Sequence, residues 1–125
     1  MMWNEPYSNE ELNEKEESSS LRSDQNPPKG FILNNKRGTG YYFNNYAVDK
    51  FLRKNGLTHI IRSKEMVSNG YKLEFNGKCI TIFSCSHYCQ TNNTAACVFA
   101  DNERIRIVRL NTSANAPAMD SGNYY

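Results

Sequence analysis

A turn signal in the middle of the chain constrains its fold most strongly. The dipeptide Asn76-Gly77 separates an alternating run, Tyr71 to Phe75, from a second β-rich run, Cys79 to Ser84. Asn-Gly between two such runs favours a tight hairpin turn, because both residues tolerate the positive φ angles that this turn requires. The two runs are therefore predicted to pair as antiparallel strands.

Local signals also predict a helix from Asn44 to Asn55. Asn44 or Asn45 can cap its start, and Gly56 can end it. Four apolar residues fall on one face at helical spacing, namely Ala47, Val48, Phe51 and Leu52. We expect this face to be buried.

Further strands are predicted on both sides of the central hairpin. Leu57 to Arg62 is a short apolar run that ends in polar residues, which is typical of a buried strand. Ala95 to Ala100 and Arg104 to Leu110 predict a second hairpin around Asp101-Asn102. The fold class is therefore α/β, with one helix followed by a mainly antiparallel sheet.

Charge divides the chain into a lead-in and a foldable part. Residues 1–28 hold seven acidic and two basic residues, a net charge of −5, whereas the remainder holds thirteen basic and six acidic residues, a net charge of +7. We expect 1–29 and 111–125 to be disordered and 30–110 to fold. The acidic segment could dock a basic regulatory protein or be a solvated insertion. The charged residues do not indicate a nucleic-acid partner.

Several short motifs occur in the order of one enzyme family. They are Met2 to Pro6, Arg37-Gly38 with Phe43, Ile61 to Glu65 with Gly70-Tyr71, and Thr81 to Ser84 with Tyr88-Cys89 and Asn93. The series resembles the C-terminal part of the catalytic domain of PPP-superfamily serine/threonine protein phosphatases, which are calcineurin-like metallophosphoesterases. In that family the first motif reads Leu-Trp-Ser-Asp-Pro. The resemblance covers residues 1–6 and 36 to about 110.

This resemblance implies an architecture and an activity. Residues 30–110 would be the C-terminal part of a metallophosphoesterase β-sandwich, and the complete domain would hydrolyse phosphate esters on phosphoproteins with two divalent metals of the Mn, Fe or Zn type. Most metal ligands come from the motifs GDxHG, GDxxDRG and GNHE, none of which occurs in these 125 residues. We expect this chain alone to bind no metal and to be inactive. The alternative is a pseudophosphatase-type module that binds anionic or phosphorylated partners.

The resemblance also implies roles for individual residues. Arg37 matches an arginine that contacts the phosphate, and its planar fork suits phosphate oxygens. Tyr88 matches a catalytic, substrate-side tyrosine, and His87 and Cys89 belong to the same substrate loop. Lys64 occupies the position of the family's ligand histidine. A protonated lysine has no lone pair, so Lys64 either marks the loss of one metal or replaces its charge.

Cysteine spacing leaves two other chemistries to weigh. Cys85-x-His87-x-Cys89, with Cys79 and Cys97, could form a zinc site, although zinc sites usually have two-residue spacers between their ligands. Cys89 could be a nucleophile beside His87, but neighbours two residues apart do not by themselves set an attack geometry. Because we find no signal peptide and no long apolar run, we expect reduced thiols, no membrane partner, and a cytoplasmic or nuclear location.

Overall fold

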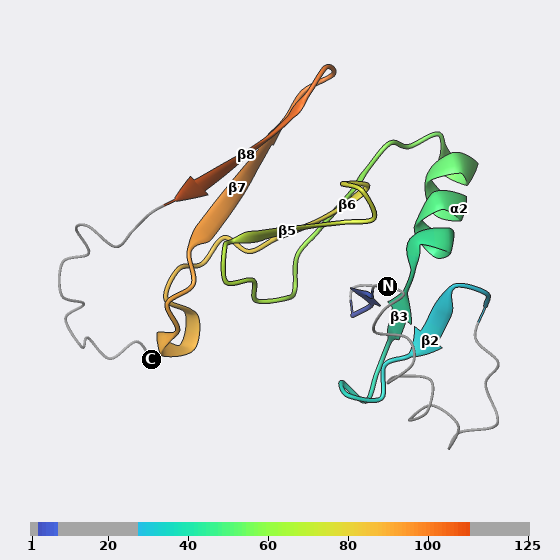
Figure 1. Cartoon of the computed structure of the whole chain (residues 1–125), viewed down its shortest axis with the longest axis horizontal. Helices are drawn as coiled ribbons and strands as arrows, with labels where there is room; N and C mark the ends of the chain where they lie inside the picture. The colour runs from blue at the N-terminus through green and yellow to red at the C-terminus, as the bar shows by residue number, and fades with distance from the viewer. Residues whose placement is uncertain (1–2, 8–27, 111–125) are drawn as a thin grey trace, which may run out of the picture. The chain divides into compact units, whose positions relative to one another are not determined.

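Figure 1 shows the computed structural model of the chain, which describes residues 3–7 and 28–110. Most of the predicted lead-in and the whole predicted tail lie outside the described residues. The chain forms two compact units, Met1–Lys64 with Leu73–Thr81 and Glu65–Lys72 with Ile82–Tyr125. The two units are described separately.

A small sheet at the start of the first unit was not predicted. It contains β1 (Glu5–Pro6), β2 (Phe31–Leu33) and β3 (Tyr41–Phe43) in the order β1-β3-β2. β1 runs parallel to β3, and β2 runs antiparallel to it. Strands of two and three residues are too short to show an alternating pattern. The disorder predicted for 1–29 is therefore wrong for Glu5–Pro6, which the pairing with β3 orders.

Three buried residues form the core of this sheet. Tyr7, Ile32 and Tyr42 are at most 9% exposed. The rings of Tyr7 and Tyr42 meet edge to face, with centroids 6.2 Å apart. Such a contact adds about 0.5–1.5 kcal/mol to the burial of the rings. This small core positions the residues that flank β1.

Helix α2 (Asn45–Asn55) begins and ends as the sequence predicts. The Asn44 side chain accepts a hydrogen bond from the Ala47 N–H at 3.2 Å, and Gly56 adopts a left-handed conformation with φ of 63°. Ala47, Val48 and Leu52 are buried. Phe51, predicted to be buried with them, is instead 43% exposed. Helical spacing gives the width of an apolar face but not which of its residues the sheet covers.

The second sheet has the order β4-β6-β5. It consists of β4 (Ile60–Arg62), β6 (Cys79–Ile82) and β5 (Tyr71–Glu74). β4 pairs in parallel with β6, whose four residues are all buried. Asn76 and Gly77 both have positive φ, as expected for the predicted turn. Lys78 Nζ pairs with Asp49 Oδ1 of α2 at 2.7 Å, next to this turn.

The second unit is built on the predicted second hairpin. β7 (Ala95–Ala100) and β8 (Ile105–Leu110) pair antiparallel, with Ala95 opposite Leu110. Asp101 Oδ1 accepts the N–H groups of Glu103 and Arg104, each at 2.9 Å, and so stabilises the turn. The two predicted hairpins are both formed, but they belong to different sheets. The α/β class, with one helix and mainly antiparallel pairing, is confirmed.

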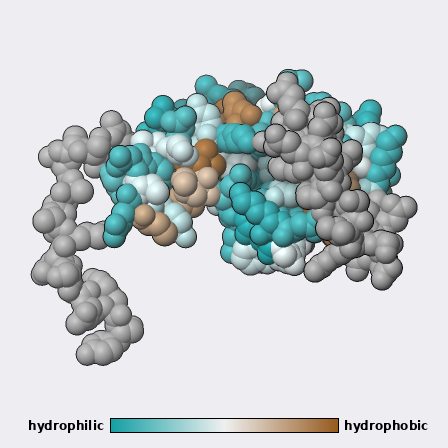
Figure 2. Space-filling view, turned by 60° about the horizontal axis from the view of Figure 1, so that its bottom comes forward, coloured by the Kyte–Doolittle hydropathy of each residue, from teal (hydrophilic) through white to brown (hydrophobic). Residues whose placement is uncertain are grey.

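Apolar side chains are also exposed on the described surface. Phe51, Ile61 and Phe99 are 43%, 47% and 56% exposed, and Figure 2 shows hydrophobic residues (brown) among hydrophilic ones. Within residues 3–7 and 28–110, no helix has the length and apolar character needed to cross a membrane. Exposed apolar side chains of this kind are typical of surfaces that bind other groups.

Two leucines at the end of α2 allow a matched test of this packing. Leu52 is 5% exposed and Leu57 is 49% exposed. We expect Leu52→Ala to lower the free energy of unfolding by about 2–4 kcal/mol, because it leaves a cavity in the core. Leu57→Ala should cost less than about 1 kcal/mol. Chemical denaturation of both variants checks this, and equal losses would contradict the packing described.

Candidate phosphate-binding site

Two cationic side chains lie against one indole ring in the first unit. Arg37 Cζ is 5.3 Å from the centre of the Trp3 ring, and Lys64 Nζ is 4.8 Å from it. A cation over an aromatic face is attracted by the negative charge density of the ring. The structure therefore brings together Arg37 and Lys64, which the sequence had placed in separate motifs.

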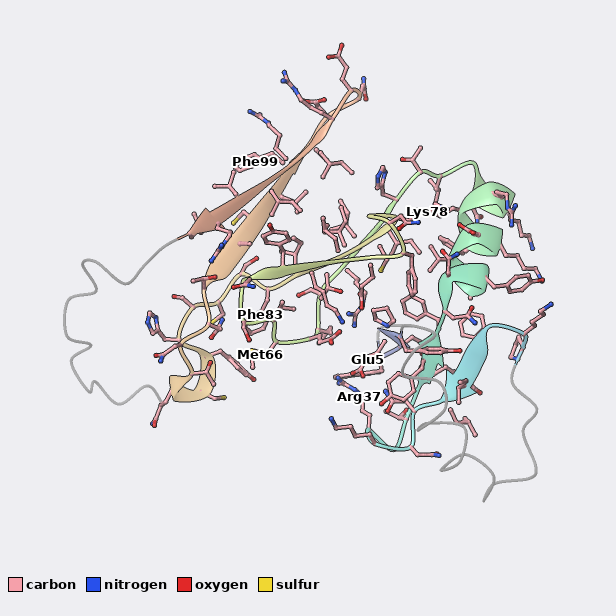
Figure 3. The ribbon with its side chains drawn as sticks, viewed as in Figure 1. Glu5, Arg37, Met66, Lys78, Phe83 and Phe99 are labelled. Atoms are coloured by element: carbon pink, nitrogen blue, oxygen red, sulfur yellow. The ribbon has the colours of Figure 1, made fainter. Side chains whose placement is uncertain are left out.

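A glutamate and an asparagine hold the arginine in place. Glu5 forms an ion pair with the Arg37 guanidinium, and Figure 3 shows the two side chains lying together. Asn34 donates from Nδ2 to Glu5 Oε2 at 3.2 Å, and its Oδ1 accepts the Arg37 N–H at 3.0 Å. Asn34 is only 2% exposed, so these hydrogen bonds satisfy a buried amide. The sequence analysis assigned no role to Glu5 or Asn34.

Glycines make the turn that carries Arg37. The Asn34 N–H donates to the Gly40 carbonyl at 3.0 Å, and the Gly38 N–H donates to the Asn34 carbonyl at 3.1 Å. Gly38 and Gly40 have φ angles of 73° and 77°. A Cβ on Gly40 would lie 2.8 Å from the Trp3 carbonyl oxygen. Gly40 therefore permits the backbone of the turn to approach Trp3.

Arg62 connects β4 to the N-terminal strand. Its Nη2 donates to the Asn4 carbonyl at 3.2 Å, and its Nη1 donates to Thr81 Oγ1 at 3.0 Å. Asn4 Oδ1 in turn accepts the Tyr41 N–H at 2.9 Å. These bonds fix the end of β4 near Trp3, and Lys64 follows two residues later. Lys64 has a φ of 75°, an uncommon conformation outside glycine that recurs at functional sites.

Potential metal ligands do not gather in the described part of the chain. Residues 3–7 and 28–110 contain no group of three or more His, Cys, Asp or Glu side chains that could hold a metal ion. Lys64, at the family's histidine position, has its ammonium on the Trp3 ring. The described residues therefore do not fit a metal centre, and none of the chemistry below is derived through one.

The predicted substrate loop belongs to the second unit. Tyr88, 47% exposed, packs edge to face on Phe83 with the ring centroids 5.3 Å apart. The residue on each side of it, His87 and Cys89, has positive φ, at 52° and 49°. The loop therefore exposes the phenol ring from a backbone conformation that costs free energy.

Asn93 compensates that cost. It is 3% exposed, and its Oδ1 accepts the Tyr88 N–H at 2.8 Å and the Thr91 hydroxyl at 2.9 Å. Its Nδ2 donates to the carbonyls of Cys85 and Thr94 at 2.6 Å and 3.2 Å. One buried amide thus fixes the whole loop. Asn93 appeared in the sequence motif, but its role required the structure.

All four cysteines are free thiols. Cys79 is buried, Cys97 is partly buried, and Cys85 and Cys89 are exposed. They do not form a three-ligand cluster with His87 within the described residues. Cys89 and His87 lie in the loop that Asn93 organises, on either side of Tyr88.

Comparisons with known proteins identify relatives of one kind. The chain is 32% identical over 105 residues to a protein phosphatase 2A catalytic protein of Dictyostelium discoideum, covering 84% of this chain and 33% of that protein. It is 36% identical over 87 residues to human serine/threonine-protein phosphatase 5, covering 69% of this chain and 17% of that protein. No protein-family model matches it.

A solved structure agrees with these sequence relatives. It is a protein serine/threonine phosphatase from Saccharomyces cerevisiae with similarity to human phosphatase PP5. The TM-score is 0.57 at 26% identity, over 69% of this chain and 30% of that one. The chain thus spans about a third or less of the length of the relatives described here.

The role of Asn93 can be tested against its neighbour. Asn93→Ala should remove four side-chain hydrogen bonds and lower the free energy of unfolding by about 1–3 kcal/mol. Hydrogen exchange measured by mass spectrometry should become faster in the loop around Tyr88. Asn92→Ala, at an exposed position, is the control and should change neither quantity. Unchanged exchange in the Asn93 variant would contradict this account.

Proposed function

Because this chain is related by sequence and fold to the PPP-superfamily serine/threonine protein phosphatases, we propose that it provides the phosphate-recognising, C-terminal portion of such a catalytic domain. The observation that carries the proposal is the placement of Arg37 and Lys64 on the same Trp3 ring. Two cations close to one another suit a phosphate monoester, which carries two negative charges near neutral pH. The partner is then a phosphoprotein or another anionic peptide.

Glu5 determines how an anion would enter this site. It pairs with Arg37, so the group formed by Arg37, Lys64 and Glu5 carries a net charge of +1. The Arg37 and Glu5 side chains are 31% and 17% exposed, so solvent and ligands reach the pair. A phosphate can take the outer edge of the guanidinium or displace Glu5 from it. Arg37 would then contact two phosphate oxygens, and Lys64 would add its positive charge.

Ester hydrolysis in the complete domain requires more than these residues supply. Two divalent metals of the Mn, Fe or Zn type would provide the attacking hydroxide there. The contribution of this chain would be to bind and orient the phosphate through Arg37, with Tyr88 as a phenol on the substrate side. By itself, we expect the chain to be inactive.

Lys64 also favours a second function. An ammonium on an aromatic ring cannot also ligate a metal, so the position that holds a ligand histidine in the family holds a fixed positive charge here. This supports a pseudophosphatase-type module that binds anionic or phosphorylated partners without hydrolysing them. Its acidic N-terminal segment could bind a basic regulatory protein. We propose a cytoplasmic or nuclear location for either function.

Hydrolysis by the purified chain tests the proposed inactivity. We expect the 125-residue protein with Mn²⁺ to release no phosphate from a phosphoserine peptide, because it lacks the three ligand motifs named above. Human phosphatase 5, assayed in parallel, is the positive control. Metal-stimulated turnover by the short chain would refute this expectation.

Binding of the same peptide tests the role of Arg37. Arg37→Ala should weaken binding about tenfold or more, because a hydrogen bond to a charged group contributes about 1.5–3 kcal/mol. Lys36→Ala removes a neighbouring, exposed charge and should change the affinity much less. Isothermal titration calorimetry measures both. Equal effects of the two substitutions would indicate general charge attraction rather than a site at Arg37.

A further inference from the structure

A cavity in the first unit lies beside the cation pair. Its volume is about 410 Å³, within the range of roughly 300–1,000 Å³ that is usual for ligand pockets. Its lining is largely apolar and aromatic, and is contributed by Phe31, Phe43, Ala47, Val48, Phe51 and Ile60. The function proposed above does not use this cavity.

Burial of the lining residues indicates where the cavity opens. Val48 and Ala47 are 1% and 7% exposed, so they belong to its base. Phe51 is 43% exposed although it lies on the same helix, and Lys64 is also exposed. The cavity therefore opens to solvent where Phe51 and Lys64 meet its edge.

Lys64 belongs to both the cavity and the cation pair. It lines the cavity, and its ammonium lies on the Trp3 ring that Arg37 also contacts. Arg62 lines the cavity as well, so its polar edge carries two positive charges. An apolar hollow with a cationic edge is complementary to a ligand that joins an anionic group to an apolar one.

We propose that this cavity binds a large aliphatic or aromatic side chain that lies close in sequence to the phosphorylated residue of a protein partner. The inference rests on the proposed phosphate site and names the class of peptide that this site prefers. The phosphate would lie at Arg37 and Lys64, and the neighbouring side chain would fill the space beside Phe51. A basic residue at that position would be repelled by Arg62 and Lys64.

Three groups of peptides separate the two halves of this recognition. One group carries phosphoserine with leucine placed in turn at each nearby position, the second has glycine in place of every leucine, and the third keeps leucine but lacks the phosphate. Binding to the full chain is measured by calorimetry. The best leucine phosphopeptide should bind roughly tenfold more tightly than its glycine counterpart, the gain expected for burying most of a leucine side chain.

A matched pair of substitutions then locates the contact. Phe51 and Tyr46 lie on the same helix and are 43% and 41% exposed, but only Phe51 lines the cavity. Phe51→Ser should remove most of the advantage of leucine over glycine while the glycine phosphopeptide binds as before. Tyr46→Ser should leave the advantage intact. A loss of binding common to all peptides would instead indicate a disturbed helix, and circular dichroism of both variants detects this.

The outcomes distinguish this inference from the proposal on which it rests. If leucine and glycine phosphopeptides bind equally well, the cavity is not part of the site and the inference fails, while the phosphate site stands. If the leucine peptide without phosphate binds as tightly as the phosphopeptide, the cavity acts without the cations and the inference also fails. If no phosphopeptide binds, the proposed function itself is wrong.

Discussion

The parallel pairing of β1 with β3 is the interaction on which the rest of the first unit depends. β1 contains only Glu5 and Pro6, yet its immediate neighbourhood provides the partners of both cations. Glu5 pairs with Arg37, and Trp3 receives Arg37 and Lys64 on its ring. The carbonyl of Asn4 receives Arg62. A two-residue strand thus joins a turn and the end of a second sheet into one site.

Electrostatics explains why such a site suits an anion. Its two cations are neither neutralised in full nor left in bulk water, since one carboxylate and one aromatic ring attend them. An ion pair at this level of exposure adds little to stability, so Glu5 and Arg37 can separate at small cost when a phosphate arrives. The apolar cavity that shares Lys64 offers a second, independent source of affinity. A ligand that satisfies both is recognised more selectively than phosphate alone.

Local signals in the sequence predicted several elements correctly. The helix, its Asn44 cap and Gly56 stop, and both hairpin turns follow from interactions between residues close in the chain. The β1-β3-β2 sheet was missed, because strands this short have no periodicity and Glu5 pairs with distant Tyr42. The placement of Phe51 was wrong, because an amphipathic pattern does not reveal how far a sheet extends over a helix.

By itself, the sequence determined which chemical groups are available. It places a fork-shaped cation at Arg37, a side chain without a lone pair at Lys64, and a phenol at Tyr88, and the chemistry of each follows from residue type alone. Only the tertiary structure decided that Glu5 holds Arg37, that Lys64 rests on Trp3, and that a cavity opens beside them. Each of these contacts joins residues far apart in the chain, and long-range packing rather than local propensity brings such residues together.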